Sequence, residues 1–311
     1  MARLNIAANR SLMKYLDLTL PTPAENLACD EALLDAAEAG EGDEVLRFWE
    51  PHEHFVVVGY ANKVATEVNV AACEIGVGLK RWGEATDEPP ISGGARTVFG
   101  SRVRSPHRLD SDDSSPRKVP ILRRCSGGGT VLQGPGCLSY ALVLRIAEDG
   151  PLRSISTANR FIMGRNRAAI EALLSRRSRR KEAHSFKSEI QNRESEIAVC
   201  GHTDLAISGL KFSGNSQRRR RHFLLFHGSF LLNLDLALVS ELLPMPSKQP
   251  DYRKSREHSE FLMNLNVSAD AVKAALRNGW RATEGFSQLP ANEIATLVEQ
   301  KYSTDAWNFR M

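Results

Sequence analysis

The chain has 311 residues, of which 42% are hydrophobic and 25% charged, and its formal net charge is +4. This composition is ordinary for a globular protein that buries a substantial core, as one large domain or two small ones. The small positive charge favours an acidic partner but is no nucleic-acid footprint, and no segment resembles a signal peptide or a membrane span. We therefore expect a cytoplasmic protein that binds neither nucleic acid nor membranes.

The cysteines also indicate a reducing compartment. The chain has five of them, an odd number without C-x-x-C spacing, which argues against a disulfide framework or a zinc site. They are Cys29, Cys73, Cys125, Cys137 and Cys200.

The first part of the chain predicts a helix, two strands and a second helix. Residues 25–38 place apolar side chains at helical spacing, with acidic residues near the start. Two runs of β-branched and aromatic residues at 45–51 and 54–60 predict strands, and 63–76 again has helical spacing. Residues 80–118 are rich in Gly, Pro, Ser and charge, which predicts an insertion that forms a surface loop or is disordered.

The rest of the chain continues with strands and helices in groups. A short strand at 119–124 leads into a glycine-rich turn, a second strand follows at 139–146, and a helix at 154–175 is followed by a polar connector. The remaining predicted elements are strands at 196–201, 204–207, 209–214 and 222–232, a helix at 235–243, an extended loop at 244–258, and helices at 269–285 and 291–302. Strands in two groups with helices before and after predict an α+β fold with mixed or antiparallel sheets.

The strongest local signal is the segment RRCSGGGTV, from Arg123 to Val131. Three consecutive glycines cost conformational entropy, but they allow close backbone approach and positive φ, so that successive N–H groups can converge on an anion. Arg123 and Arg124 add positive charge suited to phosphate or carboxylate. A glycine hairpin with exposed arginines explains the same residues equally well, and Arg123 can equally be structural.

A second signal is the strand-like segment GHTDLAISGLKFSGNSQ at 201–217. Lys211 has apolar neighbours there, and a lysine held in a partly dry site stabilises negative charge better than one in water. An outward-facing strand lysine is the plain alternative. The basic runs at 176–181 and 218–221 are expected to be solvated faces, with docking of an acidic carrier domain as the alternative.

Both segments resemble motifs of the lipoate–protein ligase A family, within the superfamily of biotin and lipoate ligases and octanoyltransferases. The first is similar to the signature loop R-R-x-S-G-G-G-x-V, and the second to G-x-x-D-L-x-x-x-G-x-K-x-S-G-x-x-Q. The resemblance covers most of 20–80 and 119–311. It implies a class II synthetase-like catalytic domain at 12–245, with 246–311 as an extended loop and helices packed on the same domain.

The resemblance also implies roles for individual residues. Lys211 matches the essential lysine that grips the substrate carboxylate and phosphoryl oxygens. Asp204 is implied to contact the adenylate or, weakly, magnesium, with a turn-capping role as the alternative. The implied substrate- and adenylate-binding residues are Arg124, Ser126, Gly127, Gly128, Gly129, Thr130, Val131, Leu132, Ser213 and Gly214. Asn26, Asp30, Glu31, Trp49 and His227 fit weaker family positions and are expected to pack or line the pocket, with a catalytic His227 as a minor alternative.

From this resemblance we predict an ATP- and magnesium-dependent lipoate–protein ligase. It would activate lipoate or octanoate as an acyl adenylate and pass it to a lysine of a carrier, such as a lipoyl domain of a 2-oxoacid dehydrogenase or the glycine cleavage H protein. The short chain after residue 243 leaves little room for the family's accessory domain, so a separate accessory subunit is a further expectation.

Two alternatives stay open. An octanoyltransferase would take the chain from an acyl carrier protein through a thioester on Cys200 or Cys137. The turn from Gln133 to Gly136, where ligases have a His-Asp pair, is closer to that branch. We prefer the ligase because the nucleophile of the cysteine-dependent branch lies farther upstream of the lysine than Cys200. The other alternative is a non-catalytic homologue that binds a lipoyl group or a nucleotide.

Overall fold

The computed structural model describes residues 13–76, 117–182 and 196–310. Within these residues, eight strands form one large mixed sheet in the order β11-β1-β2-β6-β10-β9-β8-β7. Strand β1 runs parallel to β2 and β11, and the other neighbours are antiparallel. The strands are β1 (Lys14–Asp17), β2 (Val45–Trp49), β6 (Cys137–Arg145), β7 (Ile197–Cys200), β8 (Asp204–Ile207), β9 (Leu210–Arg219), β10 (Phe223–Leu231) and β11 (Glu284–Gly285).

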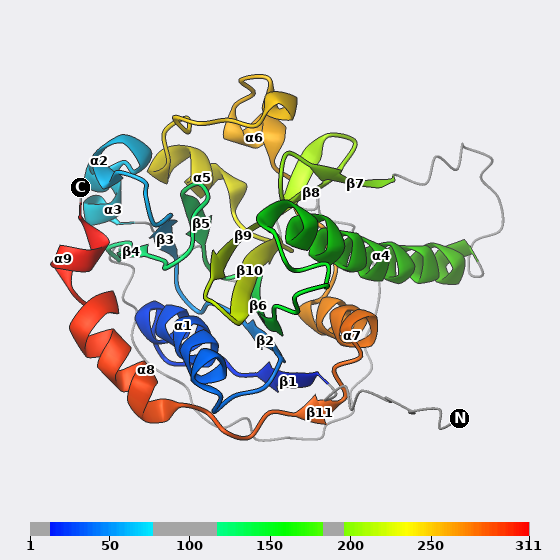
Figure 1. Cartoon of the computed structure of the whole chain (residues 1–311). Helices are drawn as coiled ribbons and strands as arrows, with labels where there is room; N and C mark the ends of the chain where they lie inside the picture. Colours follow the sequence, from blue (N-terminus) through cyan, green and yellow to red (C-terminus); the bar gives the residue numbers. More distant parts are fainter. Residues whose placement is uncertain (1–12, 77–116, 183–195, 311) are drawn as a thin grey trace, which may run out of the picture.

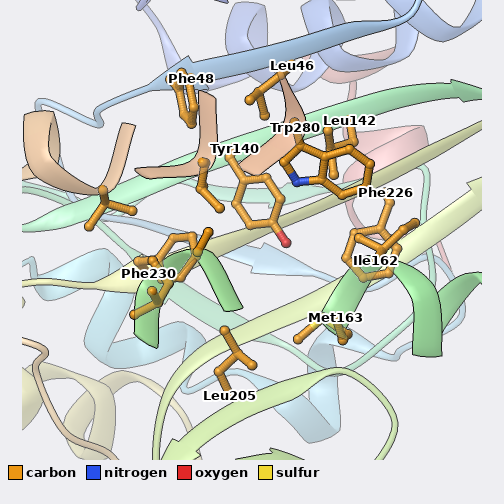
Figure 2. Close-up of a cluster of buried hydrophobic side chains, with 14 of the residues drawn as sticks. Leu46, Phe48, Tyr140, Leu142, Ile162, Met163, Leu205, Phe226, Phe230 and Trp280 are labelled. Atoms are coloured by element: carbon orange, nitrogen blue, oxygen red, sulfur yellow. The ribbon is translucent and has the colours of Figure 1, made fainter. Parts of the chain in front are cut away.

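One face of the large sheet is covered by α4 (Ile155–Glu182) and α7 (Ala269–Trp280), which lie side by side in Figure 1. The core beneath these helices is formed by alternate side chains of the strands, because every second side chain of a strand points to the same face of the sheet. Figure 2 shows this cluster, in which Tyr140 and Leu142 of β6 and Phe226 of β10 meet Ile162 and Trp280 of the helices.

The opposite face is covered by α1 (Pro23–Ala39) and α8 (Ala291–Leu297), which packs on the outer side of α1 (Figure 1). Helix α1 starts at a capping box, in which Thr22 accepts from the backbone of Glu25 and the Glu25 carboxylate accepts from that of Thr22. It ends at Gly40, whose φ of +84° suits a glycine C-cap. Leu34 of α1 and Leu225 of β10 belong to the core on this side.

A three-stranded sheet in the order β4-β3-β5 lies beside the large one. Its strands are β3 (Phe55–Val58), β4 (Ile121–Arg123) and β5 (Val131–Gln133), and the glycine-rich loop connects β4 to β5. Val56 and Val58 of β3 share a third core cluster with Leu242. The helices that contribute to this cluster are α2 (Val64–Glu67), α3 (Val70–Ile75) and α5 (Leu236–Leu242).

The predicted α+β class is confirmed, but several helices differ from their predicted bounds, three of them for reasons that the backbone shows. The helix predicted at 63–76 is two short helices, because Asn69 interrupts the first and caps the second through Ala72 N–H. The helix predicted at 269–285 ends at Trp280, because Arg281 adopts a left-handed φ of +55°. Helix α4 extends past residue 175 to Glu182, into the predicted polar connector.

Strands β1, β5 and β11 were not predicted, and the loop predicted at 244–258 holds a short turn. It contains the 3-10 helix η1 (Asp251–Arg253) and leads into α6 (His258–Phe261). The chain ends with a π-helical turn η2 (Val298–Tyr302) and α9 (Asp305–Asn308). Apart from its last two residues, the insertion predicted at 80–118 lies outside the described residues. No helix in the described ranges is long and apolar enough to span a membrane.

Candidate functional site

A cleft with a volume of about 770 Å³ joins the two sequence motifs. Gly128, Gly129 and Thr130 of the glycine-rich loop form one wall, and β9 with Lys211 and Gly214 forms the facing one. Residues 246 and 248–253, from the loop before α6, close a third side. The lysine and the glycine-rich loop, predicted separately from the sequence, therefore meet in a single cavity.

Lys211 is one of the cationic side chains that line this cleft. Its Nζ lies 2.9 Å from Asp204 Oδ1, and the side chain is 22% exposed, so the ammonium is both held and accessible. The other oxygen of Asp204 accepts a hydrogen bond of 2.8 Å from the Tyr252 hydroxyl. Burial, followed by the charge of Asp204, raises the pKa of Tyr252 and keeps it a hydrogen-bond donor. Asp204, the first residue of β8, thus holds the Lys211 ammonium at the cavity through its carboxylate.

Gly214 makes the room that the lysine needs. A Cβ on this residue would lie 2.7 Å from Lys211 Nζ and 3.5 Å from Asp204 Oδ1. The backbone of Gly214 is not in the left-handed region, so space rather than φ requires glycine here. The Lys211 ammonium can therefore occupy its position only because residue 214 has no side chain.

The substitution Gly214→Ala tests this requirement. We expect the added methyl to displace the Lys211 ammonium and to lower kcat by about tenfold or more, because small displacements of an aligned group are costly. The melting temperature should change little, since the neighbour that must move is the end of a flexible side chain. Gly164→Ala in α4 is the matched control, because this glycine is exposed, lines neither pocket, and would carry a Cβ with nothing within 4 Å. Equal activity of both variants would contradict the packing requirement.

Arg124 shapes the glycine-rich loop from inside. Its guanidinium donates to the carbonyl oxygens of Gly127 (2.6 Å from Nη2), Gly129 (2.7 Å) and Val57 (3.3 Å). Burial lowers the pKa of Arg124 to about 10, so the side chain remains charged at neutral pH. Among the described residues, its hydrogen-bond acceptors are carbonyls only. It therefore brings an uncompensated positive charge to the wall of the cleft, where it favours a negatively charged or polarised group.

Two glycines let this loop lie close to the small sheet. Gly128 has a φ of +85°, and a Cβ on Gly59 would lie 2.0 Å from the Gly128 carbonyl oxygen. Neither Gly127 nor Gly129 meets such a constraint, since a Cβ on either would contact nothing within 4 Å. Of the three consecutive glycines, the central one is therefore the residue that the backbone geometry requires.

Behind the loop, a chain of polar side chains crosses from β10 to α1. Ser126 Oγ lies 2.5 Å from His227 Nε2 and 2.8 Å from Ser216 Oγ, and His227 Nδ1 lies 3.1 Å from Asp30 Oδ2. Burial alone would raise the pKa of Asp30, but Arg47 and the hydrogen bond from His227 outweigh it and lower the pKa. The Asp30 carboxylate therefore accepts hydrogen bonds from Arg47 and His227. His227 and Ser216 both line the cleft.

A smaller apolar pocket of about 100 Å³ adjoins the cleft at Lys211 and Thr130. Its lining includes Leu132, predicted to bind substrate, together with Leu231 and Leu243. Ser213, another predicted contact, also lines this pocket. An apolar chain can thus lie beneath the ammonium of Lys211 while a polar head stays in the main cleft.

The predicted site residues fall into two groups in the structure. Ser126 and Gly127 line neither pocket; Ser126 is buried behind the loop. The others line one pocket or both: Arg124, Gly128, Gly129, Thr130, Val131, Leu132, Asp204, Lys211, Ser213 and Gly214. Ser216 and Tyr252 are among the cleft residues that the sequence analysis missed, and it gave Asp30 and His227 minor roles.

The proposed nucleophiles lie outside both linings. Cys137 is buried, and burial raises the pKa of its thiol to about 12, which argues against a thiolate there. Cys200 ends β7, and burial together with Asp204 raises its pKa. Among the described residues, which include all five cysteines, Cys200 is the one whose side chain is not buried. No group of three or more His, Cys, Asp or Glu side chains in the described ranges is placed to hold a metal ion.

Comparison with known proteins agrees with the motifs. Residues 22–81 and 95–281 match the lipoyl protein ligase A/B catalytic domain. The chain is 24% identical to the octanoyltransferase LipM of Geobacillus kaustophilus, over 97% of this chain and 99% of that one. It is 27% identical to the octanoyltransferase LipM of Symbiobacterium thermophilum, over 92% and 94% of the two chains.

Solved structures show the same fold. The Ta0514 protein of T. acidophilum with bound lipoic acid superposes with a TM-score of 0.60 at 20% identity, over 96% of this chain and all of that one. A lipoate-protein ligase A bound with ATP gives a TM-score of 0.60 at 21% identity, over 96% and 99% of the two chains. At this identity the likeness shows the fold alone.

The relatives correct one prediction. They are named octanoyltransferases, so the ATP-dependent ligase preferred from the sequence is wrong. That preference came from the spacing between Cys200 and Lys211, whereas the turn at Gln133–Gly136 pointed to the transferase branch. The matched domain spans most of the chain and contains both motifs, and the chain belongs to the lipoyl protein ligase A/B catalytic domain family.

Proposed function

We propose that this protein transfers an octanoyl group from a thioester donor to the ε-amine of a lysine on a lipoyl-type carrier domain. The observation that carries the proposal is the position of Lys211. Its ammonium stands in the cleft, held by Asp204, with the glycine-rich loop opposite and the apolar pocket beneath it. The names of the full-length relatives support octanoyl as the group transferred.

The reaction needs positive charge where the thioester carbonyl oxygen becomes an oxyanion. Lys211 supplies a fixed ammonium in a cleft partly screened from water, where it stabilises the developing charge more than it would in solution. Arg124, which is buried, adds a second positive charge on the facing wall. The acceptor amine attacks the carbonyl carbon, the C–S bond breaks, and the products are an amide and a thiol.

The thioester donor distinguishes this reaction from adenylation. A thioester is already activated, so transfer from it consumes no nucleotide. We expect the purified chain to octanoylate an apo lipoyl domain when it is given octanoyl acyl carrier protein without ATP or magnesium. Mass spectrometry of the lipoyl domain measures the product. Octanoylation that occurs with free octanoate, ATP and magnesium but not with the thioester would overturn the proposal.

The placement of the thiols supports direct attack by the acceptor amine. Since Cys200 lies outside the linings of both pockets and its pKa is raised, we expect Cys200→Ala to keep the rate of transfer within about threefold of that of the wild type. Cys73→Ala, at a buried thiol in α3, serves as the control for loss of a sulfhydryl. A loss of about a thousandfold in Cys200→Ala alone would assign a covalent thioester to this residue.

The carrier domain is proposed as the acceptor by analogy. One structural neighbour is described as a bi-partite lipoate protein ligase with its E2 lipoyl domain from Thermoplasma acidophilum, at 20% identity and a TM-score of 0.60. Cytoplasmic location and a separate accessory subunit stay predictions of the sequence. A transferase that uses an activated donor gives the accessory subunit no adenylation step to assist.

A further inference from the structure

The polar chain behind the glycine-rich loop has a direction. Asp30 is ionised and can only accept, so His227 Nδ1–H donates to it. In the neutral imidazole with its proton on Nδ1, Nε2 carries no proton and accepts from the Ser126 hydroxyl at 2.5 Å. Ser126 in turn accepts from the Ser216 hydroxyl at 2.8 Å. The hydrogen bonds therefore run one way, from Ser216 in the cleft to the imidazole.

Each member of this chain is held by a different element. His227 lies on β10 and pairs directly with Ser216 on β9, so both side chains leave the same face of the sheet. Ser126 comes from the loop after β4, and Asp30 from α1. Arg47 of β2 is fully buried and donates to Asp30 from 2.5 Å, which fixes the carboxylate. This arrangement has the base-and-orienter geometry of proton-transfer sites.

The cleft end of the chain lies near the lysine. Ser216 and Gly214 are alternate residues of β9 and point to the same face, about 6.6 Å apart at the usual rise of a strand. The ammonium of Lys211 stands over Gly214. There is thus room for a carbonyl group whose oxygen contacts Lys211 and whose carbon lies between the ammonium and the Ser216 hydroxyl. An amine that attacks this carbon would reach Ser216.

We propose that Ser216, Ser126 and His227 form a proton relay that serves the attacking amine, with Asp30 as the positioning residue. This inference rests on the proposed acyl transfer. The acceptor ammonium first loses one proton to solvent, and the neutral nitrogen forms the C–N bond. Its next proton passes through the Ser216 and Ser126 hydroxyls to His227 Nε2. As the C–S bond breaks, the imidazolium returns this proton by the same path to the leaving sulfur, which departs as a thiol.

Replacing the acceptor lysine by hydroxylamine distinguishes a proton-relay role of His227 from a structural one. Hydroxylamine is uncharged at neutral pH and its nitrogen is far more acidic after attack than that of lysine, so water can take the proton. We expect His227→Gln to lower kcat for the lipoyl-domain lysine by about 100-fold or more, and for hydroxylamine by less than about tenfold. A glutamine that merely disturbed the fold would lower both rates equally. His222→Gln, at an exposed histidine before β10, should leave both rates unchanged.

Ser216 supplies a second test, because its partly exposed side chain is easier to replace than the buried His227. Ser216→Ala should show the same split between acceptors, and Ser216→Thr, which keeps a hydroxyl and suits a strand, should restore the lysine reaction. Equal losses for both acceptors, full activity of Ser216→Ala, or an octanoyl ester on Ser216 detected by mass spectrometry would overturn the relay. A wild-type protein that transfers octanoate from the thioester to neither acceptor would instead contradict the proposed function.

Discussion

Replacing Lys211 by methionine is expected to lower kcat for octanoyl transfer by about 100-fold or more, because the oxyanion loses the fixed charge that stabilises it. Methionine keeps an unbranched side chain of similar length, so the walls of the cleft should remain in place. The melting temperature should be nearly unchanged, since a partly exposed ion pair such as Lys211–Asp204 contributes little to stability. The measurement is the single-turnover rate of lipoyl-domain octanoylation beside a thermal melt.

A lysine elsewhere on the surface controls for loss of charge. Lys63→Met removes an exposed lysine before α2, and its rate should equal that of the wild type. A Lys211→Met protein that transfers octanoate at an undiminished rate would remove Lys211 from the site. A Lys211→Met protein that melts well below the wild type would show instead that the lysine is structural.

The local parts of the site were predictable from the sequence. The glycine-rich segment and the lysine strand are each contained in a short stretch of sequence. The cost of consecutive glycines and the charge of a lysine among apolar residues already indicate that each stretch can bind a negatively charged group. Their meeting in one cleft was implied by resemblance to a family. The helix at 25–38 and the strands β4, β6, β8, β9 and β10 were also predicted, because runs of apolar residues mark them.

The polar relay was beyond single-sequence reasoning. His227 is 101 residues from Ser126 and 197 from Asp30, and each looks like a packing residue in its own segment. The contacts exist because β10 lies in the middle of the sheet and α1 covers that face. The short strands β1 and β11 were missed for a similar reason, since they gain their hydrogen bonds from partners distant in the sequence.

The sequence left the role of Arg123 open, because this arginine and Arg124 both precede the glycines and both are cations. In the structure they diverge: Arg124 lines the cleft, whereas Arg123 turns toward the end of the chain and is 1% exposed. Its guanidinium donates to six carbonyl oxygens, those of Gly59, Tyr60, Asn62, Trp307, Asn308 and Arg310. Of the two roles left open by the sequence for Arg123, this geometry supports the structural one.

Arg123→Ala is therefore expected to lower the free energy of unfolding by about 3 kcal/mol, because buried carbonyls lose a charged donor and a cavity forms. Arg123→Lys should not restore stability, since one ammonium cannot reach acceptors that a planar guanidinium spans. Denaturant unfolding gives the free energy, and hydrogen exchange should rise first in 305–310, where half of the acceptors lie. Arg221→Ala, at an exposed arginine between β9 and β10, is the matched control. If both alanine variants unfold at the same denaturant concentration, the terminal helix α9 is held by the contacts of Trp307 with Tyr60 and Tyr302 rather than by Arg123.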